Sequence, residues 1–209
     1  MTVLSAIFTV LIGAFVFGAA ALLGTMAALA LLPKLTPLED GPEPLRVHPG
    51  ALIGGAAAIG AFMAWRHAPM PELLTSALLC GVLAAIWYCD AKTGIIPDVF
   101  TLVPLGLAIL DAFFAHQLVQ VLISSAVLFV PFALGAVFSK GRGMGWGDAK
   151  LAALAGAMLG MLLATFTLGV ASLIAVIVAS IRYRSKPVPI AFGPYMVAAI
   201  ALGIAYKAL

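Results

Sequence analysis

The sequence predicts an all-α polytopic membrane protein, folded as a transmembrane bundle of about eight helical segments. Hydrophobic residues make up 64% of the 209 residues and charged residues only 9%, and the mean hydropathy is +1.20. Soluble domains contain about 25% charged residues. Several apolar runs also reach the roughly 17–25 residues that a helix needs to cross a bilayer. We therefore expect residues 1–209 to form a single integral membrane domain in contact with the lipid bilayer.

Proline-rich and charged breaks divide the chain into eight apolar segments. Five prolines and several charges predict a surface loop at 33–49, and together with two helices this loop makes up an N-terminal part, residues 1–72. Residues 73–209 are expected to form a six-helix core. A break at Gly160 would leave a short helix that need not cross the bilayer if protein surrounds it, although one long kinked helix over 149–181 is the alternative. The expected segments are 3–32, 50–65, 73–89, 99–115, 118–138, 149–159, 161–181 and 190–208.

Lys and Arg positions predict the orientation of these segments. No basic residue precedes the first apolar run, which suits a retained first helix with its N-terminus outside. With that start, nine of the eleven basic residues fall in inside loops, and only Arg66 and Lys207 fall outside. An excess of Lys and Arg marks the cytoplasmic face. The basic residues are scattered rather than clustered, so the net charge of +3 does not indicate a nucleic-acid partner.

Two acids stand at ends of apolar segments on the predicted cytoplasmic side. Asp90 follows the third segment, where the helix dipole disfavours a negative charge. Asp148 precedes the sixth, where its simplest role is that of a helix N-cap. A surface salt bridge with Lys92 is the alternative for Asp90, and an N-cap is the simplest role for Asp98. Acids beside hydrocarbon nevertheless mark functional sites.

The residues around these acids suggest a paired-carboxylate site. Gly141, Gly143, Gly145 and Gly147 leave the backbone before Asp148 free to adopt positive φ and to approach a neighbouring chain. Two carboxylates within a few Å share a proton, and one then acts as general base and the other as general acid around a water. Cys80 and Cys89 lack metal-binding spacing and are interpreted as core residues. We expect neither a bound metal nor an organic cofactor.

Three motifs, in order along residues 80–207, resemble those of the type IV prepilin peptidases, which are membrane aspartic proteases. Residues 145–151, Gly-Trp-Gly-Asp-Ala-Lys-Leu, resemble that family's Gly-x-Gly-Asp-x-Lys-Leu signature. Asp90 with Ile-Pro-Asp at 96–98 is similar to its first motif. Phe-Gly-Pro-Tyr at 192–195 is similar to its Pro-Phe-Gly-Pro-aromatic segment, with alanine in place of the first proline.

The resemblance implies an aspartic endopeptidase of the cytoplasmic (inner) membrane whose active site faces the cytoplasm. Its substrate would be a prepilin or pseudopilin, from a pilus or a secretion system, with a basic leader and an apolar helix. Asp90 and Asp148 would be the catalytic dyad, supported by Asp98, Lys150 and the glycines 145 and 147. Bifunctional members carry a zinc-binding insertion with two CxxC pairs, associated with N-methylation. The loop at 33–49 has no cysteine, so methyltransferase activity is not expected.

Two other functions fit parts of the same pattern. A proton- or cation-coupled transporter would use the paired acids as ion ligands, but it would be expected to place them near the bilayer midplane. A non-catalytic subunit of a pilus or secretion machine would keep the fold and tolerate loss of either acid. The position of both acids at cytoplasmic segment ends favours the peptidase.

Overall fold

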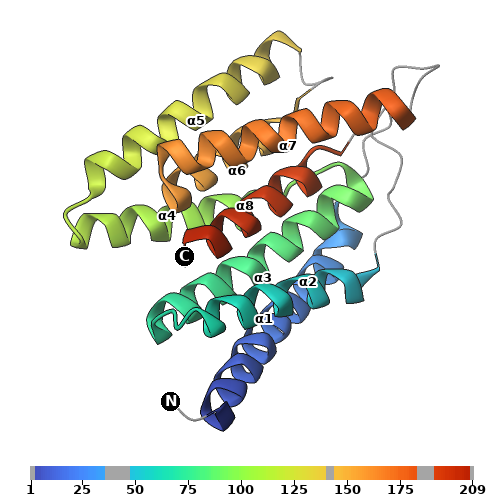
Figure 1. The fold of residues 1–209 in the computed structure, drawn as a ribbon. Helices are drawn as coiled ribbons and strands as arrows, with labels where there is room; N and C mark the ends of the chain where they lie inside the picture. Colours follow the sequence, from blue (N-terminus) through green and yellow to red (C-terminus); the bar gives the residue numbers. More distant parts are fainter. Residues whose placement is uncertain (1–2, 36–47, 140–143, 183–190, 208–209) are drawn as a thin grey trace.

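The computed structural model describes residues 3–35, 48–139, 144–182 and 191–207, and over these residues it contains helices and turns but no strand. The all-α prediction is confirmed for this part of the chain. The described ranges contain eight α-helices and one 3-10 turn (Figure 1): α1 Val3–Leu31, η1 Leu32–Lys34, α2 Pro49–Trp65, α3 Met70–Thr93, α4 Asp98–Phe114, α5 Leu118–Phe138, α6 Trp146–Leu159, α7 Met161–Arg182 and α8 Gly193–Lys207.

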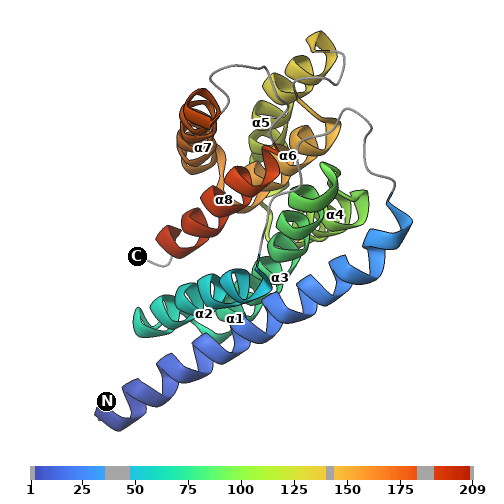
Figure 2. The same cartoon turned by 90° about the vertical axis from the view of Figure 1, so that its right-hand side faces the viewer.

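The helices form two groups that α8 joins. Helix α1 packs along α2 and α3, while α6 packs against α4, α5 and α7. Helix α8 contacts α3 on one side and α6 and α7 on the other (Figures 1 and 2). The carboxyl end of α3 and the amino ends of α4, α6 and α8 meet at one end of the bundle. The first turn of α1 and the last turn of α8 lie at the other end (Figure 1).

Within the part of the chain that the structure describes, four helices are long and apolar enough to cross a membrane, judged by length and composition. They are Leu4–Lys34, Met70–Thr93, Leu118–Phe138 and Met161–Ile181, and Pro49–Trp65 is a shorter apolar helix. Large apolar side chains cover the outward faces of α1 and α7, for example Phe8 and Phe15 on the first and Phe166 on the second. Such surfaces suit contact with lipid chains.

Helix α6 is the short, protein-enclosed helix that the sequence suggested. It has 14 residues, and the side chains of Leu151 and Leu154 are fully buried. Gly160 ends it with a φ of +78°, a conformation that glycine adopts without steric cost. Residues 149–181 therefore form two helices rather than one kinked helix.

Several predicted boundaries were wrong by a turn or less because backbone hydrogen bonds, rather than hydrophobicity, end the helices. Helix α3 continues past Cys89 to Thr93, where Gly94 at a φ of +68° donates its N–H to the Asp90 carbonyl. Helix α8 begins at Gly193 rather than at residue 190, since the carbonyl of Phe192 accepts the N–H groups of its first turn. In the predicted loop at 33–49, Pro33 lies in η1 and Pro49 opens α2. Residues 36–47 lie outside the described residues.

Candidate active site

The two acids singled out in the sequence are both buried at the same end of the bundle. Asp90 is 4% exposed and Asp148 is 8% exposed. Their carboxylates are near enough to interact electrostatically, although they lie on different helices, α3 and α6. Carboxylates are seldom buried without a cation or a set of donors. The fold therefore places two costly groups together.

Asp90 lies in the last turn of α3 and is held by the amino end of α8. The N–H of Gly193 donates to Oδ2 of Asp90 over 3.0 Å, across 103 residues of sequence. Residues 192–195 carried the third sequence motif, but Gly193 was not among the expected site residues. This motif was the signal in the sequence that pointed to the region. The donor itself could not be predicted, because the Gly193 N–H reaches Asp90 only when α3 and α8 are packed together.

Asp148 is the third residue of the first turn of α6 rather than its N-cap, so the N-cap interpretation was wrong. Gly145 is the N-cap, and its N–H donates to Oδ2 of Asp148 over 3.0 Å. Helix α6 is not among the helices long enough to cross a membrane. Burial raises the pKa of the Asp148 carboxyl, and the hydrogen bond from Gly145 opposes this by stabilising the ionised form.

Of the four glycines before Asp148, Gly141 and Gly143 lie outside the described residues, and Gly145 and Gly147 do not use positive φ. Gly145 is extended at a φ of −84°, and positive-φ glycines among the described residues occur at Gly94 and Gly160. The second predicted use, close approach to a neighbouring chain, holds for Gly147. A Cβ on Gly147 would lie 2.8 Å from Cβ of Ile96, in the Ile-Pro-Asp motif. The absence of a side chain at Gly147 thus lets two of the sequence motifs touch.

Asp98 and Lys150 form an ion pair that joins α4 to α6. Nζ of Lys150 lies 2.6 Å from Oδ1 of Asp98, with the side chains 27% and 59% exposed respectively. The N-cap role for Asp98 was wrong, since Pro97 occupies that position and Asp98 is the first residue of α4. Lys92, the alternative partner for Asp90, places its ammonium 6.0 Å from the ring centre of Tyr88.

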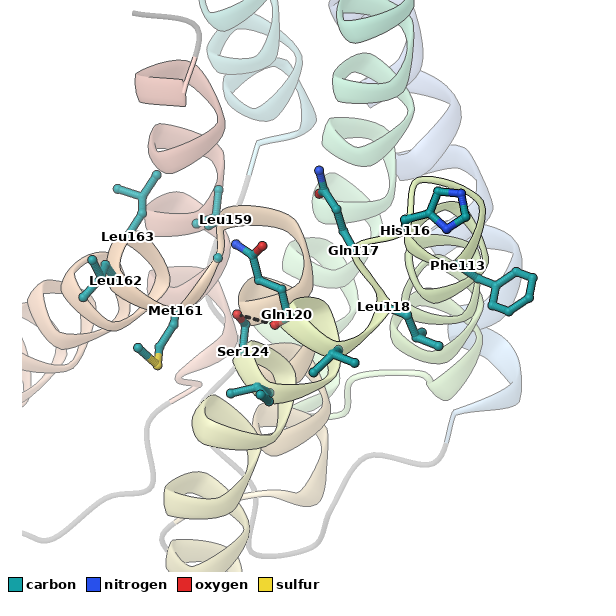
Figure 3. Close-up of a pocket in the computed structure, with 13 residues that line it drawn as sticks. Phe113, His116, Gln117, Leu118, Gln120, Ser124, Leu159, Met161, Leu162 and Leu163 are labelled. Atoms are coloured by element: carbon teal, nitrogen blue, oxygen red, sulfur yellow. Dashed lines mark hydrogen bonds between the residues drawn. The ribbon is translucent and has the colours of Figure 1, made fainter.

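The described residues show no metal-binding cluster of three or more His, Cys, Asp or Glu side chains. A pocket of about 1020 Å³ lies between the α4–α5 turn and the α6–α7 turn (Figure 3). Leu159 and Gly160 line it at the carboxyl end of α6, whereas Asp148 is at the amino end. The pocket is thus separate from the paired acids.

Comparison with known proteins identifies the family. No curated protein and no solved structure matched the chain. The model of the type IV leader peptidase family matches residues 77–180. The match runs from α3 into α7, so it includes both buried acids and the Asp98–Lys150 pair, while Gly193 lies beyond it. With this match over the helices that hold its two buried carboxylates together, the chain belongs to the type IV leader peptidase family and is a membrane peptidase.

Proposed function

We propose that this protein is an aspartic endopeptidase that removes the basic leader of prepilin-like proteins at the cytoplasmic face of the inner membrane. The observation that carries the proposal is the pair of buried carboxylates, Asp90 and Asp148, each with one oxygen held by a backbone N–H. Residues 73–209 would be the catalytic core. Residues 1–72 would brace it, since α1 packs along α3.

The pair performs hydrolysis with water alone. The ionised carboxylate takes a proton from a water as its oxygen bonds to the scissile carbonyl carbon, and the protonated partner gives its proton to the carbonyl oxygen. The tetrahedral intermediate then collapses: the C–N bond breaks, the leaving nitrogen receives a proton from the dyad, and the carbonyl re-forms. The shared proton returns to the pair, so the cycle needs no metal or organic cofactor.

The orientation and the substrate follow from charge. Under the N-outside arrangement, nine of the eleven Lys and Arg residues fall on the same side of the membrane as the two acids, and this excess supports a cytoplasmic position for the dyad. A prepilin presents its basic leader on that face and keeps its apolar helix in the bilayer. Asp98 is 59% exposed and pairs with Lys150, two residues after Asp148, so this ion pair would support the dyad by holding α4 against α6. The loop at 33–49 has no cysteine to bind zinc, so the product amine is left unmethylated.

The decisive experiment is cleavage of a prepilin from the same organism by the purified protein in lipid, with N-terminal sequencing of the product. Asp90→Asn and Asp148→Asn should each abolish cleavage while the protein stays inserted, because an amide cannot exchange the proton. The double variant should be no worse than either single variant, since members of one catalytic unit are not additive. Asp111→Asn, at an exposed acid on α4, is the matched control and should cleave normally. Substantial cleavage by either dyad variant would refute the aspartic mechanism and turn attention to transport.

A further inference from the structure

We propose that the backbone N–H of Gly193 is a positioning group for Asp90, and that residue 193 is glycine because the carboxylate occupies the space of a side chain. The inference rests on the proposed peptidase function and assigns a role to the first turn of α8. Three features carry it: the donor set of that turn, the steric contact at Gly193, and the burial of the bond.

The first turn of α8 leaves one N–H free to serve Asp90. Pro194 has no N–H to donate. The N–H groups of Tyr195 and Met196 donate back to the carbonyl of Phe192, over 3.1 and 3.3 Å. The N–H of Gly193 therefore remains, and it donates to Oδ2 of Asp90 over 3.0 Å.

A side chain at position 193 would displace the carboxylate. A Cβ on Gly193 would lie 2.7 Å from Oδ2 of Asp90 and 2.9 Å from its Cγ. Both residues are buried, so a side chain added at position 193 would push against the carboxylate group itself. The contact and the hydrogen bond thus fix the same oxygen from the same direction.

The bond determines which oxygen of Asp90 remains for chemistry. Within the described part of the chain, the hydrogen bond found on Asp90 reaches Oδ2, as the Gly145 bond on Asp148 does. Each carboxylate oxygen has two lone pairs, and the backbone N–H occupies one of those on Oδ2, so Oδ1 keeps more capacity for a proton or a water. The two amides accordingly leave Oδ1 of each acid for the shared proton and the attacking water.

A single-atom replacement tests the hydrogen bond without adding a side chain. Gly193→glycolic acid, introduced by cell-free translation into lipid, replaces the N–H by an ester oxygen. We expect kcat for prepilin cleavage to fall about ten- to a hundredfold, the range for a buried hydrogen bond to a charged group, with KM within about threefold of wild type. Gly203→glycolic acid, the same change at the far end of α8, is the control and should keep its activity.

Alanine substitutions test the steric half. Gly193→Ala should lower kcat for prepilin cleavage at least as much as Gly193→glycolic acid does. In Gly203→Ala the new Cβ meets the end of the Leu159 side chain at 2.6 Å, and this variant should stay within a few fold of wild type. The positioning role would be overturned if Gly193→glycolic acid were as active as wild type. It would also be overturned if the same substitution lowered kcat equally at positions 193 and 203. Because Asp90→Asn is assayed alongside, an inactive Asp90→Asn with a fully active glycolate variant refutes this inference alone. A fully active Asp90→Asn refutes the peptidase proposal.

Discussion

Gly147→Ala places a methyl group between two of the motifs that form the candidate site. The new Cβ would lie 2.8 Å from Cβ of Ile96 and 3.3 Å from its Cγ1, whereas carbon atoms pack at about 3.5–4.0 Å. The first turn of α6 or the segment before α4 must therefore move by about 1 Å. Asp148 is the next residue, and a displacement of about 1 Å at a catalytic group costs about a hundredfold in rate. We expect a loss of that size in kcat for prepilin cleavage.

Two further variants separate this steric cause from a general effect on α6. Gly145→Ala should keep most of its activity, because its new Cβ would come no nearer than 3.6 Å to Oδ2 of Asp148 and its φ of −84° suits alanine. Ile96→Gly removes the Cβ that the new methyl group meets, whereas Ile96→Ala retains it. Gly147→Ala should therefore cost less activity in the Ile96→Gly background than in the Ile96→Ala background. Equal costs in both backgrounds, or an unimpaired Gly147→Ala, would refute the reasoning.

Three shorter predictions concern charge and orientation. The Asp98–Lys150 pair is partly exposed, so its coupling energy in a double-mutant cycle of thermal unfolding should be only about 0.2–1 kcal/mol; a coupling several times larger would show that the pair is effectively buried. The pKa of Asp148 is raised by burial, so the folded state holds this proton more tightly than the unfolded state. Stability should then fall as pH rises from about 4, the ordinary carboxyl pKa, to about 6, the raised pKa of Asp148, and should level off above that. Asp148→Asn should flatten the fall in melting temperature between pH 4 and pH 6, and an unchanged slope would contradict the assignment. When cysteines are introduced at positions 92, 142 and 68, a membrane-impermeant thiol reagent added to intact cells should label position 68 but not positions 92 and 142. Labelling of position 142 from outside would contradict the predicted orientation.

The sequence predicted the helices well because apolar runs and prolines act locally. Their ends were harder to predict, since they depend on single hydrogen bonds. Helix α3 ends one turn past Cys89, where Gly94 caps it in the left-handed conformation. Helix α8 begins three residues after the predicted position, where the carbonyl of Phe192 accepts the N–H groups of its first turn. Hydropathy alone does not report either bond.

The site shows the same division between local and long-range information. The unfavourable position of Asp90 is visible in the sequence, because the helix dipole disfavours an acid at the carboxyl end of an apolar segment. Asp148 is visible through its glycine-rich motif, since a helix start favours an acid. The pairing of Asp98 with Lys150, the contact of Gly147 with Ile96 and the donor from Gly193 depend on the packing of separate helices. Taken alone, each of these residues fits a common local role. For Asp98 and Asp148 the predicted local role was that of a helix N-cap, and it was wrong.

The hydrogen bond from Gly193 also orders the assembly of the protein in time. Synthesis runs from the amino end, so both acids are added to the chain before residue 193. A nascent chain that stops short of α8 holds the two carboxylates but lacks the N–H that fixes Oδ2 of Asp90. Insertion of the last helix is thus the step that completes the arrangement.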